Sequence, residues 1–136
     1  MDKIALVIIL IVVALGAGFF IWQNGSNTNF SVPPTQLPEG VVLFYSPDCP
    51  HCMVVEDFIS TNKIADKVKF SKLEVAFGTR TSAELVANAE AAALKAKECK
   101  INIAGGISIP FLWDGNKCYI GKDDIISFFK NAAEIK

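Results

Sequence analysis

The sequence predicts one α/β domain in which a mixed four-stranded sheet is flanked by three helices, preceded by one N-terminal transmembrane helix. Two observations carry this prediction. Segments typical of strands and helices follow in the order strand, helix, strand, helix, hairpin, helix, which places a mixed sheet between helices on both faces. An uncharged stretch near the start accounts for a hydrophobic content of 51%, which is high for a soluble domain. The 136 residues leave room for one catalytic unit and an appendage.

The appendage is an apolar stretch at residues 4–22 that contains no charged residue. As a helix it would be about 28 Å long, close to the ~30 Å hydrocarbon core of a bilayer. We therefore expect a membrane anchor at residues 1–22. A cleaved signal peptide is the alternative, because the small residues at 16–18 could form a cleavage site. Against it, the apolar run continues to Trp22, which suits a membrane interface.

The charges around this stretch predict its orientation. Lys3 precedes it and the next basic residue is Lys63, so the positive-inside rule keeps the N-terminus cytoplasmic and places the domain outside. Residues 23–40 have the Pro, Gly, Asn, Ser and Thr content of a flexible linker, and residues 41–136 form the domain. Thirteen Lys and Arg against 14 Asp and Glu leave a net charge of −1, so no nucleic-acid partner is expected.

The first half of the domain alternates strand, helix and strand. Residues 41–45 are a short apolar run, as in a central strand that is buried on both faces. In residues 52–63 apolar side chains recur every three or four positions, which predicts a helix opened by the Cys-Pro-His-Cys motif at 49–52. An imperfect alternation of apolar and polar residues predicts a second strand at 67–75.

The second half begins with an Ala-rich helix. Thr81 and Glu84 have the spacing of a capping box, and the helix is expected to continue to about Cys99. Leu85, Ala89, Ala92 and Ala96 form a stripe along it.

A hairpin and a last helix complete the prediction. Residues 107–113 and 116–120 are expected to pair around Asp114-Gly115, which supplies the positive backbone angles of a type I′ turn. Residues 123–133 are expected to form the closing helix.

Three segments give the sequence a family resemblance. They are Phe-Tyr-Ser-Pro-Asp-Cys-Pro-His-Cys at residues 44–52, Ile109-Pro110 at the start of a strand, and Gly-Lys-Asp-Asp-Ile at residues 121–125. Over about residues 41–136 the chain resembles the thioredoxin and glutaredoxin superfamily, which implies a thioredoxin-like fold. The Cys-Pro-His-Cys core is similar to the bacterial periplasmic disulfide oxidant (DsbA) family, whereas the short body and the segment at 121–125 look more like glutaredoxin.

The Cys-Pro-His-Cys motif has the spacing that thiol–disulfide exchange needs. Two intervening residues let Cys49 sit exposed at a helix N-terminus while Cys52 stays within disulfide reach. Unpaired amides and the partial positive charge of the helix end stabilise a Cys49 thiolate. The resemblance implies that Cys49 attacks and Cys52 resolves the mixed disulfide. Pro50 and His51 are expected to tune the pair, His51 by adding a donor or a positive charge that makes the disulfide a stronger oxidant; the alternative for His51 is a solvated filler.

Pro110 is, by resemblance, the cis proline that lies against the active-site cysteines, with Ile109 offering its backbone to an extended substrate. The alternative is an ordinary proline at the first position of an edge-like strand. One departure from the family concerns Leu43, which occupies the position where thioredoxins and the periplasmic oxidants often have a carboxylate behind the second cysteine. The group that deprotonates Cys52 would then be water, His51 or a residue that the sequence does not place.

The remaining cysteines are Cys99 and Cys118. An even cysteine count in an oxidising compartment favours a disulfide between them, and the inferred fold lets them approach within about 6 Å; the alternative leaves both thiols free. A zinc site is disfavoured, because these two cysteines are not a second closely spaced pair. Neither a metal nor a cofactor is expected.

These features predict an extracytoplasmic, membrane-tethered thiol–disulfide oxidoreductase. Its favoured role is a disulfide oxidant or isomerase acting on protein thiols and disulfides, with a redox partner in the membrane. One alternative is a tethered thioredoxin-like reductant, for instance of the cytochrome maturation type. Another is a non-catalytic binding module that keeps Cys49 and Cys52 as a structural disulfide, for which a reduction potential below about −300 mV would be typical.

Overall fold

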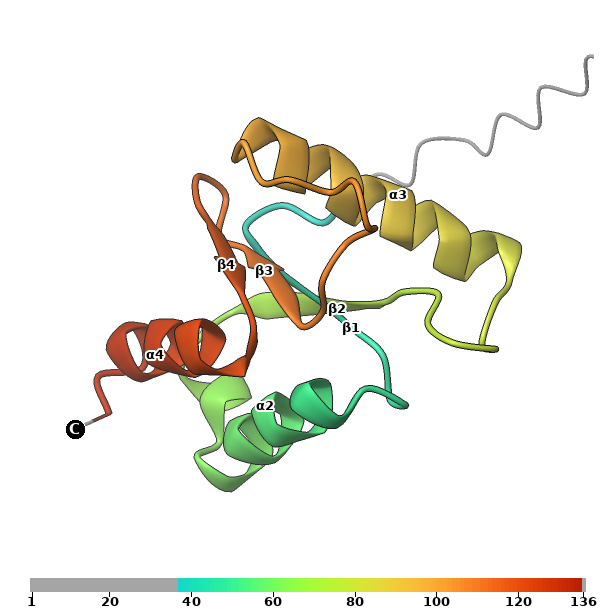
Figure 1. Cartoon of the computed structure of the whole chain (residues 1–136). Coiled ribbons are helices and arrows are strands. Elements are labelled where there is room, and N and C mark those ends of the chain that lie inside the picture. The colour runs from blue at the N-terminus through green and yellow to red at the C-terminus, as the bar shows by residue number, and fades with distance from the viewer. Residues whose placement is uncertain (1–36, 136) are drawn as a thin grey trace, which may run out of the picture. The chain divides into compact units, whose positions relative to one another are not determined.

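The structure is a computed structural model that describes residues 37–135 (Figure 1). The elements in chain order are β1 (Val41–Tyr45), α2 (Pro50–Thr61), the 3-10 helix η1 (Ile64–Asp66), β2 (Phe70–Glu74), α3 (Ala83–Glu98), β3 (Phe111–Trp113), β4 (Cys118–Ile120) and α4 (Lys122–Ala132). The predicted anchor at residues 1–22 and the linker up to residue 36 lie outside the described residues. Within residues 37–135, no helix combines the length and the apolar character needed to cross a membrane.

The four strands form one mixed sheet in the order β2-β1-β3-β4. Strand β1 runs parallel to β2 and antiparallel to β3, and β3 is antiparallel to β4. Helix α3 covers one face of the sheet, while α2 and α4 cover the other (Figure 1). The predicted mixed sheet with three flanking helices is therefore confirmed for this part of the chain, and the arrangement fits a thioredoxin-like α/β fold.

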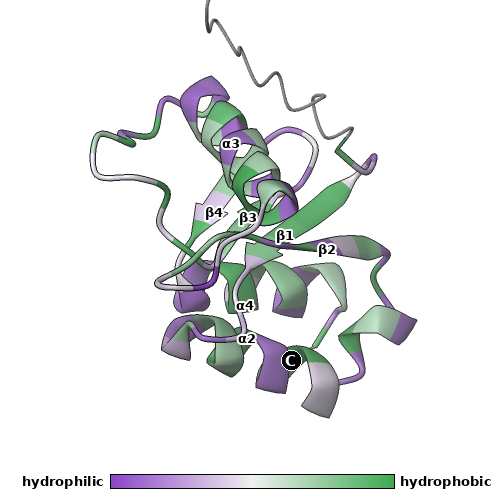
Figure 2. Ribbon diagram, turned by 90° about the vertical axis from the view of Figure 1, so that its right-hand side faces the viewer, coloured by the Kyte–Doolittle hydropathy of each residue, from purple (hydrophilic) through white to green (hydrophobic). Residues whose placement is uncertain are grey.

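Strand β1 contributes to a hydrophobic core on each face of the sheet. Val42 and Phe44 point to the α3 side and Leu43 points to the α2 and α4 side, and all three are fully buried. This confirms the predicted central strand, which Figure 2 shows as a hydrophobic ribbon. Leu37, which the sequence assigns to the linker, packs against the core on the α3 side.

Helix α3 begins one residue later than the capping-box prediction places it. The N-cap is Ser82, whose Oγ accepts a hydrogen bond from the backbone N–H of Leu85 at 3.2 Å, so Glu84 lies in the first turn rather than at the reciprocal position. Of the predicted stripe, Ala92 and Ala96 are fully buried, whereas Leu85 and Ala89 are partly buried. The buried residues are Ala87, Asn88, Ala91, Ala92 and Ala96. Small side chains let this helix lie close to the sheet, and Asn88 is buried because its Nδ2 donates to the Glu74 carbonyl oxygen at 2.8 Å.

The β3–β4 hairpin is shorter than predicted and turns one residue later. Strand β3 starts only after the Ile109–Pro110 peptide bond, which is cis, and Pro110 has no N–H for a strand ladder. The central turn residues are Gly115 and Asn116 rather than Asp114-Gly115, because Asp114 N–H donates to the Lys117 carbonyl oxygen at 3.0 Å. The Asp114 carboxylate accepts the backbone N–H groups of Asn116 and Lys117, which fixes this register.

The remaining boundaries differ by a few residues. Helix α2 begins at Pro50, two residues before the predicted start, because a proline suits the first helical position. Lys63 turns the chain with a φ of 50°, and the unpredicted helix η1 follows. Because the N–H groups of Lys67 and Val68 donate to the Ile64 carbonyl oxygen of η1, β2 is limited to Phe70–Glu74 instead of residues 67–75. Helix α4 starts one residue before its predicted position.

Candidate active site

Cys49 and Cys52 lie in the first turn of α2, directly after β1 ends. Cys49 is the N-cap of this helix, and its Sγ accepts the backbone N–H of Cys52 at 3.4 Å. Cys49 N–H in turn donates to the Ser46 carbonyl oxygen at 3.2 Å, which fixes the bend between strand and helix. A sulfur at this position lies at the positive end of the helix dipole, where a thiolate is favoured.

The predicted exposure of Cys49 is wrong. Cys49 is only 3% exposed and Cys52 is 1% exposed, and both are free thiols. Cys49 is covered because the loop before β3 lies against it: its thiol donates to the Ile109 carbonyl oxygen at a sulfur–oxygen distance of 3.7 Å.

The loop before β3 brings Ile109 and Pro110 to the cysteines from 60 residues away. Their peptide bond is cis, and the Pro110 carbonyl oxygen accepts the N–H of Gly121 at 2.9 Å. This hydrogen bond ties the loop to the start of α4. The two predicted substrate-binding residues and the two predicted redox cysteines therefore meet at one edge of the sheet.

The environment of Cys52 strongly favours its protonated form. The pKa of Cys52 is raised from 9.0 to about 12, chiefly by burial and then by its hydrogen bond with Cys49. A backbone hydrogen bond from Ser46 opposes this in part, whereas the charge of Glu56 adds to it. Cys52 therefore needs a proton acceptor before it can act as a nucleophile.

Pro50 and His51 are both exposed in the first turn of α2. Pro50 occupies a first-turn position that has no need of a backbone donor. His51 faces solvent beside the cysteines, and its predicted tuning of the pair stays a prediction.

Two charged pairs beside the cysteines were not identified from the sequence. Arg80, in the loop between β2 and α3, binds Asp48 with Nε 2.9 Å from Oδ2, and Asp48 directly precedes Cys49. This ion pair raises the pKa of Arg80. The position of Asp48 is a local signal that sequence reasoning could have used, whereas Arg80 is brought to it only by the fold.

The second pair joins Glu56 of α2 to Lys72 of β2. Their Oε2 and Nζ atoms are 2.6 Å apart, and the Lys72 ammonium also lies 5.1 Å from the centre of the Tyr45 ring. Glu56 follows Cys52 by four residues, so both lie on one side of the helix. That spacing was visible in the sequence, but the partner on the neighbouring strand was not.

Cys99 and Cys118 form a disulfide in the structure, with their Cα atoms 6.2 Å apart. It joins the C-cap of α3 to the first residue of β4. Both residues are half-buried, and they border a hollow of ≈ 350 Å³ that is also lined by Ile101, Asn116 and Lys117. In the part of the chain that the structure describes, no three His, Cys, Asp or Glu residues are grouped so as to hold a metal ion.

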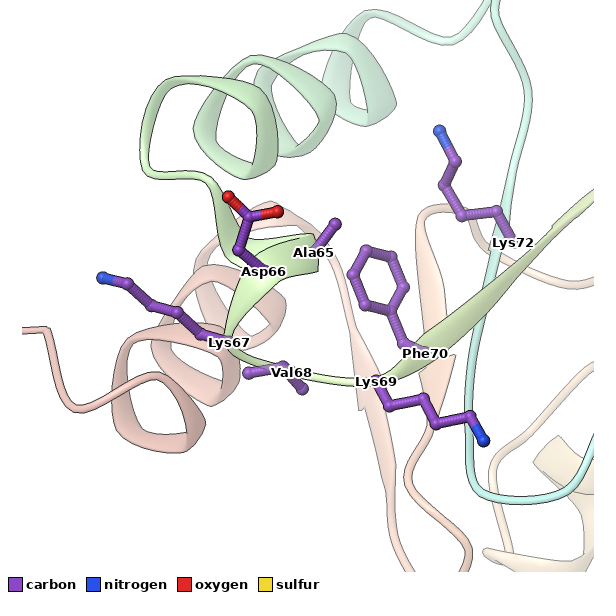
Figure 3. A pocket seen from close by; sticks show the side chains of 7 residues that line it. All are labelled: Ala65, Asp66, Lys67, Val68, Lys69, Phe70 and Lys72. Atoms are coloured by element: carbon purple, nitrogen blue, oxygen red, sulfur yellow. The ribbon is translucent and has the colours of Figure 1, made fainter.

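A larger hollow lies away from the cysteines, where η1 leads into β2. It has a volume of ≈ 530 Å³ and is lined by Ala65, Asp66, Lys67, Val68, Lys69, Phe70 and Lys72 (Figure 3). None of these lining residues is a cysteine, serine, threonine or histidine, and Lys72 connects the hollow to helix α2 through its ion pair with Glu56. The first turn of α2, with Cys49 and Cys52, is therefore the better candidate for an active site.

Comparisons with known proteins add little to this geometry. No protein-family model matches the chain. No curated protein matches it either. Among solved structures, the chain is similar to oxidized glutaredoxin 2 from Chlamydomonas reinhardtii, with 22% identity and a TM-score of 0.42 over 69% of this chain and 74% of that one. We therefore base the function on the site itself.

Proposed function

We propose that this chain is an extracytoplasmic, membrane-tethered thiol–disulfide oxidoreductase that acts through Cys49 and Cys52 as a disulfide oxidant or isomerase. The observation that carries this proposal is the pair of free thiols in the first turn of α2, with Cys49 against the carbonyl oxygen of Ile109.

The reaction uses the two cysteines in turn. In the oxidised protein, a substrate thiolate attacks Cys49 Sγ, the bond between Cys49 and Cys52 breaks, and Cys52 leaves with the electron pair and takes up a proton. A second substrate thiolate then attacks the substrate sulfur of the mixed disulfide, and Cys49 leaves as a thiolate. The substrate gains a disulfide, and the protein pair is reduced by two electrons. An extended substrate that pairs with the backbone of Ile109 would lie against Cys49.

The direction of electron flow follows from which redox form is stabilised. The helix end and the N–H of Cys52 favour a Cys49 thiolate, whereas the Ile109 carbonyl oxygen favours the Cys49 thiol, and both species exist only in the reduced form. Stabilising the reduced form makes the disulfide a stronger oxidant. His51 adds to this effect when it is protonated or donates a hydrogen bond.

The experiment that tests this function is equilibration of the pair with glutathione. We expect a reduction potential above roughly −200 mV, and replacing His51 by Gln should lower it toward the thioredoxin value of about −270 mV. A wild-type potential near about −270 mV would instead favour the tethered reductant. A potential below about −300 mV together with no exchange activity would favour a structural disulfide in a binding module.

The tether and the compartment rest on the apolar residues 4–22 and on Lys3 before them. A redox partner in the same membrane would then reoxidise the pair. A topology reporter fused after Lys136 should be active only outside the cytoplasm. Reporter activity confined to the cytoplasm would contradict the extracytoplasmic placement. The proposed thiol exchange would then be tested by the reduction potential alone.

A further inference from the structure

The proposed exchange reaction leaves one chemical need unmet. Cys52 is 1% exposed, and its pKa is raised to about 12. Each cycle must nevertheless give this sulfur a proton or remove one, because only its thiolate attacks or leaves. Bulk water reaches such a buried thiol poorly, so a group of the protein is needed to carry the proton.

The obvious candidates do not meet this need. Leu43 is apolar and fully buried at the strand position behind the cysteines. His51 is exposed, whereas Cys52 is buried, so the two side chains lie in different surroundings although they are adjacent in sequence.

Glu56 has the position that the reaction requires. It follows Cys52 by one helical turn, which places their Cβ atoms about 5–6 Å apart on the same side of α2. The carboxylate is close enough for its charge to contribute to the raised pKa of Cys52. The Glu56 side chain is 31% exposed, so it can exchange protons with solvent as well as with the buried thiol.

The two oxygens of Glu56 have different surroundings. Oε2 is held by Lys72 at 2.6 Å, whereas Oε1 is buried and has no hydrogen-bond partner among the described residues. A buried acceptor without a partner is unusual in a folded protein and calls for a reason. A proton that passes between this oxygen and Cys52, directly or through one water, supplies that reason.

Lys72 holds the carboxylate at this place. It pairs in register with Leu43 on the neighbouring strand and rises from β2 on the side of α2 (Figure 3). Its ammonium also lies over the Tyr45 ring. The helix residue Glu56 and the strand residue Lys72 thus bring an acid–base group to the side of the sheet where Leu43 leaves none. The titratable groups that face Glu56 are Lys72, its ion-pair partner, and Cys52, whose thiol is affected by its charge; the Tyr45 ring lies against Lys72.

We propose that Glu56 is the acid–base residue for Cys52, an assignment that rests on the proposed redox function. When a substrate thiolate attacks Cys49, the bond between Cys49 and Cys52 breaks, and the departing Cys52 sulfur takes up a proton that Glu56 first accepts from solvent and then passes on. In the reverse direction, Glu56 takes the Cys52 proton, the Cys52 thiolate attacks Cys49 Sγ, and the substrate leaves as a thiolate. Lys72 is a positioning residue, because it acts through Glu56.

The test separates the two steps of one turnover. The reduced full-length chain in detergent is mixed with glutathione disulfide, quenched with acid at set times and weighed by mass spectrometry. Cys49 first forms a mixed disulfide with glutathione, and Cys52 then resolves it. In Glu56→Gln we expect the mixed disulfide to form at the wild-type rate but to resolve about 100-fold more slowly, and Glu56→Asp to recover part of that rate. The resolving rate is also measured as a function of pH. The wild-type profile should contain a step from the titration of a carboxylate, and this step should be absent in Glu56→Gln.

The matched control is Asp57→Asn, which removes an exposed carboxylate from the next position of the same helix. It should resolve the mixed disulfide like the wild type. If Glu56→Gln resolves as fast as Asp57→Asn, Glu56 does not carry the proton and the proposal is overturned. If the wild type itself never forms a mixed disulfide, the proposed redox function fails instead, so the two failures are distinguishable. Thermal unfolding of each variant shows whether a slow step reflects a damaged fold.

Discussion

The two cysteine pairs of this chain differ in redox state, in burial and in their position on the fold. Cys49 and Cys52 are free, almost fully buried and placed at the N-terminus of a helix, with Asp48 directly before Cys49 and Glu56 four residues after Cys52. Cys99 and Cys118 are half-buried, joined as a disulfide, and placed where a helix ends and an edge strand begins. The surroundings of Cys49 and Cys52 suit a change of redox state, whereas the Cys99–Cys118 disulfide links the end of α3 to β4.

The difference teaches that burial alone does not make a cysteine inert. Cys52 is the most buried of the four, yet the charge of the Glu56 carboxylate reaches it, and Lys72 holds that carboxylate in place. Beside the Cys99–Cys118 disulfide, Lys117 and Asn116 border the hollow, but no carboxylate lines it. Position on a helix also differs, because only an N-terminal sulfur faces the positive end of the dipole.

The largest expected effect comes from removing the sulfurs of the first pair. Cys49→Ser should lower the rate of disulfide exchange by at least about 10³-fold, because no other group supplies the attacking thiolate. Cys52→Ser should stop at the mixed disulfide with glutathione. Rates measured by mass spectrometry check both. If disulfide exchange persists in Cys49→Ser, another cysteine carries the activity, and the two pairs do not differ in function as proposed.

Removing the second pair should cost stability rather than activity. The Cys99→Ala/Cys118→Ala variant opens a loop with a sequence separation of 19, for which the chain-entropy estimate is about 3 kcal/mol. Urea unfolding of this variant and the wild type measures the difference. Its exchange rate at 25 °C should stay within a few-fold of the wild type. An unchanged stability, or thiol counting that finds four free thiols in the untreated wild type, would contradict the linking role.

The raised pKa of Cys52 predicts a pH-dependent stability of the reduced protein. The folded state keeps this proton up to about pH 12, whereas the unfolded thiol loses it near 9.0, so the folded state binds more protons between these values. The stabilisation is complete below pH 9 and falls by up to ~1.4 kcal/mol per pH unit above it. Urea unfolding from pH 8 to 10.5 should show a steeper loss for the reduced wild type than for Cys52→Ser. Parallel curves would mean that burial does not perturb this thiol.

The smallest expected effect concerns the ion pair in front of Cys49. Arg80→Gln leaves the Asp48 charge unpaired beside Cys49 and disfavours its thiolate, but both partners are about half exposed. We expect alkylation of Cys49 by iodoacetamide to slow by about two- to five-fold at low salt. At about 1 M salt the difference should disappear, because exposed charges are then screened. An Asp48→Asn/Arg80→Gln variant should restore the wild-type rate, and an equally slow double variant would show that the charge of Asp48 is not the cause.

Sequence patterns alone gave the elements and the reactive motif. The apolar run at Val41–Tyr45 required a strand buried on both faces, and Pro50 with its flanking cysteines required a helix start, because these are local preferences of the backbone. Element boundaries were less certain where two signals competed. Thr81 and Ser82 both suit an N-cap, and the structure has Ser82 there. At the hairpin, hydrogen bonds to the Asp114 carboxylate determine the turn register, and residue spacing does not reveal these bonds.

The tertiary structure decided which distant residues surround the cysteines. Ile109 covers Cys49, Arg80 reaches Asp48, and Lys72 holds Glu56, and each of these contacts joins segments at least 16 residues apart. Whether a side chain is exposed, as predicted for Cys49, or covered, as found, depends on a loop 60 residues along the chain. The sequence by itself determined that two cysteines would share a helix end, because that is a matter of spacing. Only the packing of strands and loops determined which charges lie beside them, because a sheet aligns residues by register and not by their order in the chain.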